Sequence, residues 1–131
     1  MPGLLELDEL LNSLSPKLQE GEFVFCTVQG SYSDYQHLQP LASFKEAEGL
    51  TLILPVHVAD KSHLTYEGNF SQITLTVHSS LNAVGLTAAV ASKLASHGIS
   101  ANVVAAYYHD HIFVPADKAT EAIKVLEELG R

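Results

Sequence analysis

A short polar segment stands where strand-like alternation of apolar residues gives way to helical spacing. It spans residues 79–85, and its small and polar side chains include Ser79, Ser80, Asn82 and Gly85. Backbone N–H groups at a helix start have no intrahelical partner and carry partial positive charge, so such a turn can bind a carboxylate. The missing Cβ of Gly85 would let a ligand or a second chain approach the backbone. An alternative is structural, because Ser80 or Asn82 could cap the helix while Gly85 eases its packing.

Two histidines separated by one residue are the other polar group that could do chemistry. His109 and His111 flank Asp110, and on a strand this spacing places both imidazoles on the same face. Imidazoles are common metal ligands, and a third could come from His57, His63 or His78. Two histidines at a hairpin rim are more often surface or hydrogen-bonded residues. We therefore expect no metal and no cofactor, and keep a His-based metal-binding protein as an alternative.

Common catalytic motifs are absent from the sequence. It has no Gly-rich phosphate-binding loop, no Gly-x-Ser-x-Gly nucleophile motif and no pair of cysteines. The one cysteine, Cys26, lies inside an apolar segment, where cysteine usually serves as a small buried hydrophobe and not as a nucleophile. We therefore expect a protein that is not an enzyme.

The charge distribution argues against two classes of partner. Of 131 residues fifteen are acidic and seven are Lys or Arg, a net charge of −8, and ten acids and three bases place −7 of it in residues 1–71. Phosphate binding needs clustered Lys and Arg, so we expect neither nucleic acid nor membrane as a partner. The single cysteine, an N-terminus unlike a secretory signal and the absence of a long apolar run predict a cytoplasmic protein.

The apolar spacing predicts the elements that must position these residues. In the first half they are an amphipathic helix, a buried strand and two arms of a hairpin, over residues 4–14, 22–28, 41–47 and 50–56. Pro16 is expected to stop the helix, residues 30–40 to form a loop and residues 57–70 to form a linker. The boundary after this linker divides the chain into an N-terminal half over 1–70 and a C-terminal half over 71–131.

The second half has the element order β-α-β-β-α. Ile73, Leu75 and Val77 alternate with polar residues and predict a half-buried strand. A helix over 83–97 that ends before Gly98, strands over 99–106 and 111–114, and a last helix follow. That last helix is expected to be capped by Asp117, to follow an interruption of the strand ladder at Pro115 and to end at Gly130. Both helices would cover one face of an antiparallel sheet.

This order leaves the second half one strand short. A ferredoxin-like β-α-β-β-α-β unit needs a closing strand, whereas the printed sequence ends directly after the last helix. The first half begins with a helix and then a strand, over residues 4–14 and 22–28, which is the order of the missing ending. We therefore expect two interlocked pseudo-repeats that share or exchange strands.

The segment over residues 78–115, HSSLNAVGLTAAVASKLASHGISANVVAAYYHDHIFVP, resembles the core of an ACT-like domain. It is similar to small standalone bacterial ACT-like proteins of unknown function and, more distantly, to the ACT domains of the cytosolic arginine sensor of animals. Residues 23–27 and 48–52 resemble the same standalone family. The resemblance implies an α+β, ferredoxin-like ACT sandwich, with antiparallel sheets, helices on one face and two interlocked ACT-like pseudo-repeats.

The resemblance also implies a ligand site. ACT units bind small ligands, typically amino acids, at an interface between two units, and the site includes the turn between the first strand and the first helix. Here that turn gives Ser79, Ser80, Leu81, Asn82, Ala83, Val84, Gly85 and Leu86. By similarity to the arginine sensor, Tyr107 would supply an aromatic wall and Asp110 a carboxylate for a cationic group. The chain departs from the sensor at Ala83, where the sensor has an acidic ligand contact.

These observations together predict a non-enzymatic regulatory protein that binds a small molecule, an amino acid in the first instance. The resemblance also implies a homo-oligomer, a dimer or a larger assembly. A structural or interaction protein that dimerises through its sheet edges is the main alternative.

Overall fold

The computed structural model describes residues 9, 11–76 and 85–129. These residues form two compact units. Unit 1 takes the described residues up to 20 and those from 71 onward, and unit 2 takes residues 21–70. In sequence, unit 2 is thus an insertion into unit 1. The division of the chain into repeats at residue 70 remains a prediction. The two compact units follow a different division, because the described residues up to 20 belong to the same unit as those from 71 onward.

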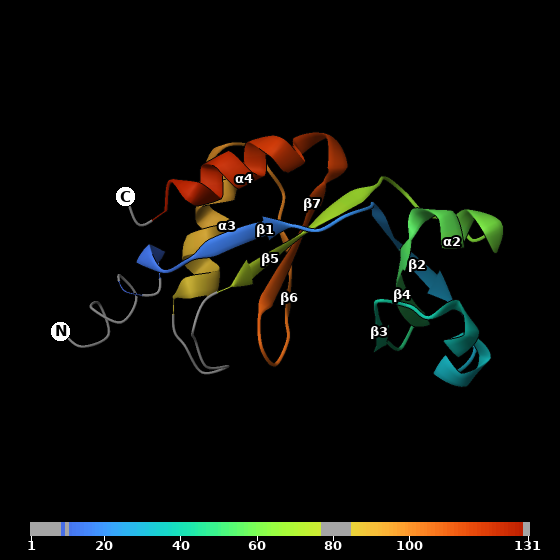
Figure 1. The fold of residues 1–131 in the computed structure, drawn as a ribbon. Coiled ribbons are helices and arrows are strands. Elements are labelled where there is room, and N and C mark those ends of the chain that lie inside the picture. The colour runs from blue at the N-terminus through green and yellow to red at the C-terminus, as the bar shows by residue number, and fades with distance from the viewer. Residues whose placement is uncertain (1–8, 10, 77–84, 130–131) are drawn as a thin grey trace. The chain divides into compact units, whose positions relative to one another are not determined.

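Unit 1 contains a sheet with the strand order β1-β5-β7-β6. Its strands are β1 (Ser15–Leu18), β5 (Phe70–Thr76), β6 (Asn102–Ala105) and β7 (Asp110–Pro115). β1 lies beside β5 and runs antiparallel to it, as Figure 1 shows. Ser15 is opposite Thr76 and Leu18 is opposite Ile73. β6 and β7 form an antiparallel hairpin in which Ala105 lies opposite Asp110.

Two helices pack on one face of this sheet. They are α3 (Leu86–Ser96) and α4 (Ala119–Glu127), and a single 3₁₀ turn, η3 (Ala116–Lys118), precedes α4. Alternate residues of β5 and β7 meet the buried faces of both helices in one cluster, whose members include Ile73, Leu75, Ile112, Val114, Leu86, Val90, Leu94, Ala122, Val125 and Leu126. Because strand residues alternate between faces, this cluster defines the helix-covered face of the sheet.

The closing strand of unit 1 comes from the first half of the chain, as the missing strand predicts, but from a different segment. It is β1, whereas residues 22–28 were expected to supply it. The described end of the first helix precedes Pro16, as predicted, and Pro16 also lies in β1 opposite Leu75, which was not predicted. β1 pairs on one side only within unit 1, and an edge strand is where proline is tolerated.

Unit 2 contains a smaller antiparallel sheet and one short helix. The strands β2 (Phe23–Val28), β3 (Ala42–Lys45) and β4 (Leu50–Pro55) have the order β3-β4-β2. Helix α2 (Val56–Lys61) covers one face, where Ala59 joins the buried residues Val24, Cys26, Val28, Leu50, Leu52 and Leu54. The first residue of β5, Phe70, pairs with Phe23. The antiparallel pairing of β3 with β4 confirms the hairpin expected over 41–56.

Other expectations for the first half change in the structure. Residues 30–40 contain two 3₁₀ turns, η1 (Tyr32–Asp34) and η2 (Gln36–Leu38). The linker predicted over 57–70 is wrong, because this segment holds most of α2 and the first residue of β5. A helix of six residues is too short for its apolar periodicity to be recognised among polar neighbours. Of the helix predicted over 4–14, residues 4–8 and 10 lie outside the described residues, and residues 9, 11 and 12 are helical.

The second half follows its prediction more closely. α3 confirms the described part of the helix expected over 83–97, and β6 and β7 confirm the hairpin. Asp117 is not the N-cap of the last helix, because it lies in η3 and Lys118 occupies the N-cap position. Pro115 is the last residue of β7 and so ends the strand. Among the described helices, none has the length and apolar character needed to cross a membrane.

Candidate functional site

The predicted ligand turn is described only at its end. Ser79, Ser80, Leu81, Asn82, Ala83 and Val84 lie outside the described residues, and Gly85 and Leu86 lie within them. Gly85, which has no side chain to act as a cap, is the N-cap of α3, and the amide of Ala89 donates the first described helical bond to the Gly85 carbonyl at 2.9 Å. The N–H groups of residues 86–88 therefore have no acceptor within α3.

Backbone geometry explains why residue 85 is glycine. Its φ is +94° and its ψ is −18°, a left-handed conformation that a residue with a Cβ adopts only with strain. Leu86 follows with 2% of its surface exposed and its side chain in the core of unit 1. Leu86 can therefore offer a ligand its backbone but not its side chain.

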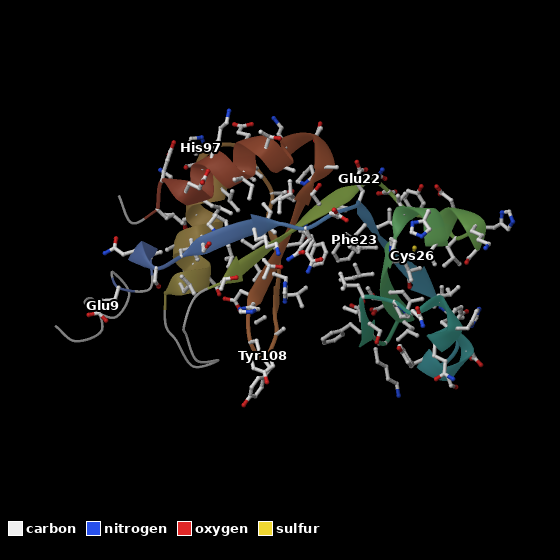
Figure 2. All side chains as sticks on the ribbon, in the orientation of Figure 1. Glu9, Glu22, Phe23, Cys26, His97 and Tyr108 are labelled. Carbon is white, nitrogen blue, oxygen red and sulfur yellow. The ribbon has the colours of Figure 1, made fainter. Side chains whose placement is uncertain are left out.

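The two predicted wall residues lie at the hairpin between β6 and β7. Tyr107 is 79% exposed in the connecting turn and its ring meets that of Tyr108 edge to face, with centroids 5.0 Å apart. Figure 2 shows Tyr108 at the tip of this hairpin, directed away from the sheet. Asp110 is the first residue of β7 and is half-buried. Tyr107 is thus open to solvent, whereas Asp110 is partly enclosed.

Side-chain contacts place the start of β7 next to the end of β5. The Nδ1 atom of His111 lies 3.0 Å from Thr74 Oγ1 and 3.1 Å from Gln72 Nε2. Thr74 is two residues before Thr76, where β5 ends, and the predicted ligand turn follows that end. Asp110, the neighbour of His111, therefore lies near the strand end from which the turn leaves.

The sheet face opposite the helices carries a polar cluster that the sequence did not predict, with two buried and two half-buried members. The cluster, here called the His111 network, consists of Gln19, Gln72, Thr74 and His111. Gln72 and Thr74 are only 8% and 6% exposed, although their alternation with Ile73 and Leu75 predicts a solvent-facing row. Burial lowers the pKa of His111, and the charge of His109 lowers it further against an opposing effect of Asp110.

The histidines do not assemble a metal site in the described part of the chain. His109 and His111 do share a face, as their spacing predicts, with ring centroids 6.4 Å apart. No group of three or more His, Cys, Asp or Glu side chains with metal-binding geometry occurs among the described residues. His57 and His63 are exposed in unit 2, and His78 lies outside the described residues.

Cys26 has the surroundings of a core residue. It is 3% exposed, carries a free thiol and packs in the core of unit 2. Burial raises the pKa of its thiol and so disfavours the thiolate that a nucleophile needs. The structure gives Cys26 a packing role.

Two family models, both described as ACT domain, match the chain in succession. The first matches residues 2–71 and the second matches residues 67–128. The two matches overlap at residues 67–71, where β5 begins. The overlap fits a strand that pairs with β2 at its first residue and with β1 further along.

Solved structures with similar folds support the same assignment. A Vibrio cholerae protein of unknown function, described as a possible transport protein, is 56% identical and has a TM-score of 0.92, with 98% of this chain and 99% of that chain covered. An Agobacterium tumefaciens protein is 15% identical over 89% of each chain, with a TM-score of 0.70. The ligand-free regulatory subunit of aspartate kinase from Thermus thermophilus is 9% identical over 87% of this chain and 95% of that one, with a TM-score of 0.67. The last two share the fold alone.

No curated protein sequence matches the chain. ACT domains are regulatory rather than catalytic and are typically ligand-binding modules. The two successive matches cover nearly all of the described residues, and the fold has the α+β, ferredoxin-like arrangement with strands shared between repeats. The chain therefore belongs to the ACT-domain family and contains two interlocked ACT repeats.

Proposed function

We propose that this chain is a non-enzymatic regulatory protein that binds an amino acid at the turn before α3. The observation that carries the proposal is the start of α3, where Gly85 takes a left-handed conformation and the N–H groups of residues 86–88 have no acceptor within the helix. Such a start presents backbone N–H groups to a carboxylate. The site residues are those expected from the sequence, Ser79, Ser80, Leu81, Asn82, Ala83, Val84, Gly85, Leu86, Tyr107 and Asp110.

Asp110 supplies the complementary charge in this proposal. Its carboxylate is half-buried near the end of β5 and suits an ammonium or guanidinium group. Residues 72–131 contain five acids and four bases, so this part of the chain is close to neutral, as a site for a zwitterion requires. We further infer a cytoplasmic protein, because its one cysteine is a free thiol, and a homo-oligomer of two or more copies.

A thermal-shift screen against the twenty proteinogenic amino acids tests the proposal. At least one should raise the melting temperature, since a ligand present at 100 times its Kd adds about 2.7 kcal/mol to the stability of the native state. Titration calorimetry of that amino acid should then show binding about tenfold or more weaker for Asp110→Asn, because a charge-assisted hydrogen bond is lost. Asp117→Asn, at an exposed aspartate in η3, is the matched control.

The proposal fails if all twenty amino acids leave the melting temperature unchanged. It also fails in its assignment of Asp110 if the Asp110→Asn and Asp117→Asn variants bind the amino acid as tightly as the original chain.

An interaction protein is the second candidate, favoured by the edge of the sheet in unit 1. β6 is the last strand in the order β1-β5-β7-β6, and its sequence, Asn102–Ala105, has none of the charges or prolines that commonly protect an edge strand. If β6 pairs between copies, Ala105→Lys should lower the mass measured by sedimentation equilibrium. If the mass is unchanged, β6 does not pair between copies.

A further inference from the structure

Four polar side chains connect three strands on the face of the unit 1 sheet that lies opposite α3 and α4. Gln19, directly after β1, donates from its backbone N–H to the Gln72 carbonyl at 2.9 Å and from Nε2 to Thr74 Oγ1 at 2.9 Å. Thr74 Oγ1 and Gln72 Nε2 both lie within hydrogen-bond distance of His111 Nδ1, at 3.0 and 3.1 Å. The chain of contacts therefore runs from the closing strand β1 through β5 to β7.

The donors in this network fit a neutral ring at His111. The Nε2 group of Gln72 can only donate, and the Thr74 hydroxyl can donate its O–H while its oxygen accepts the bond from Gln19. Both therefore point to an Nδ1 that accepts and carries no proton. A proton on Nδ1 would face the amide N–H of Gln72, and the Gln72 amide would have to turn over while Thr74 accepted a second bond.

The groups around His111 also disfavour its charged form. On its own strand His109 lies 6.4 Å away, centroid to centroid, and Asp110 is its neighbour. On β6 the residue opposite His111 is the uncharged Val104. On β1 the charged residue nearest in register is Lys17, opposite Thr74. Burial and His109 lower the pKa of His111 from its ordinary value of 6.5, and Asp110 opposes them.

We propose that the His111 network holds β1, the strand that closes unit 1, against β5, and that protonation of His111 weakens this attachment. The attachment is here called the clasp. The neutral ring holds the Thr74 hydroxyl in the orientation that receives Gln19, and a protonated ring rearranges both partners and weakens that hold. The folded pKa of His111 lies below its unfolded value, so the clasp is fully formed above about pH 6.5. It is lost as the pH falls below that value and through the lower pKa of the folded chain.

Hydrogen exchange of the amides of residues 15 and 17–19 tests the clasp in the full chain, since Pro16 has no N–H. After correction for intrinsic exchange, protection of these amides should fall roughly two- to tenfold between about pH 7.5 and pH 5, the range that loss of one hydrogen bond gives. In His111→Gln, which cannot titrate there, protection should stay constant across the same range. His109→Gln is the matched control and should keep a pH response, with its midpoint at higher pH because a charge that lowers the pKa of His111 is gone.

A spectroscopic measurement and a second variant complete the test. Imidazole ¹⁵N shifts should show the neutral His111 ring protonated on Nε2. If His111→Gln does not fold, Gln19→Ala should leave His111 titrating while the pH response of residues 15, 17 and 18 disappears. The clasp is ruled out if residues 15 and 17–19 lose protection equally in His111→Gln, if they keep protection while His111 becomes protonated, or if the neutral ring carries its proton on Nδ1.

Discussion

Replacing Leu94 by alanine is expected to lower the free energy of unfolding by about 2 to 5 kcal/mol. Leu94 is 0% exposed and lies on the face of α3 that packs into the core of unit 1. Alanine removes the apolar surface that Leu94 buries and leaves a cavity that the surrounding side chains fill only in part. The lost packing should also make α3 less rigid, including its start, to which the proposed ligand turn leads.

Urea unfolding followed by far-ultraviolet circular dichroism measures this effect. Leu18→Ala is the matched control, because Leu18 is 43% exposed on β1 in the same unit. Its loss should be less than about 1 kcal/mol. Equal losses for the two variants would contradict the packing described for α3.

A valine at position 85 is expected to abolish the response to an amino acid and to reduce stability. Gly85 has a φ of +94°, and a left-handed backbone costs an L residue about 1 to 2 kcal/mol, with more strain for a β-branched side chain. Gly85→Val should therefore unfold at lower urea concentration. It should also lose the thermal shift that an amino acid gives the original chain, because the backbone N–H groups of residues 86–88 at the start of α3 would be displaced.

Gly85→Asn separates conformation from added bulk. Asparagine enters the left-handed region more readily than other residues with a Cβ, so this variant should lose less stability than Gly85→Val and keep part of its ligand affinity. If Gly85→Val binds an amino acid as tightly as the original chain, the start of α3 is not part of the ligand site.

The elements that could be predicted from sequence are those whose pattern is local and long. The spacing of Leu86, Val90 and Leu94 identifies α3, and the apolar runs of β2 and β4 identify strands without knowledge of their partners. The need for a closing strand could be predicted as well, since a β-α-β-β-α order leaves an open edge. Local pattern thus predicts most of the strands.

The remaining elements depend on contacts that local sequence does not encode. β1, with the sequence Ser-Pro-Lys-Leu, has no apolar alternation and becomes a strand only because it pairs with β5. α2 is a six-residue helix held by Ala59 and its neighbours in the core of unit 2. Gln72 and Thr74 alternate as surface residues do, and only the arrangement of β1 and β7 beside β5 shows that they are buried.

The candidate site was predictable to a similar extent. The strand-to-helix turn follows from the change of period near residue 80, and the described end of that turn is a helix start, as expected. The reason for Gly85 could not be read from sequence, because a positive φ is a property of the folded backbone. The assignment of Leu86 as a ligand contact is limited to its backbone, since its side chain completes a helical apolar face and is buried.

The insertion of unit 2 within unit 1 imposes an order on assembly as the chain leaves the ribosome. All the residues of β2, β3 and β4, and Phe70, which pairs with Phe23, lie between residues 21 and 70, so unit 2 can complete its pairing while the rest is still being made. β1 emerges first but has no partner until β5 follows, since Gln19 and Thr74 are 55 residues apart in sequence. The earliest strand to be synthesised is therefore among the last to find its place.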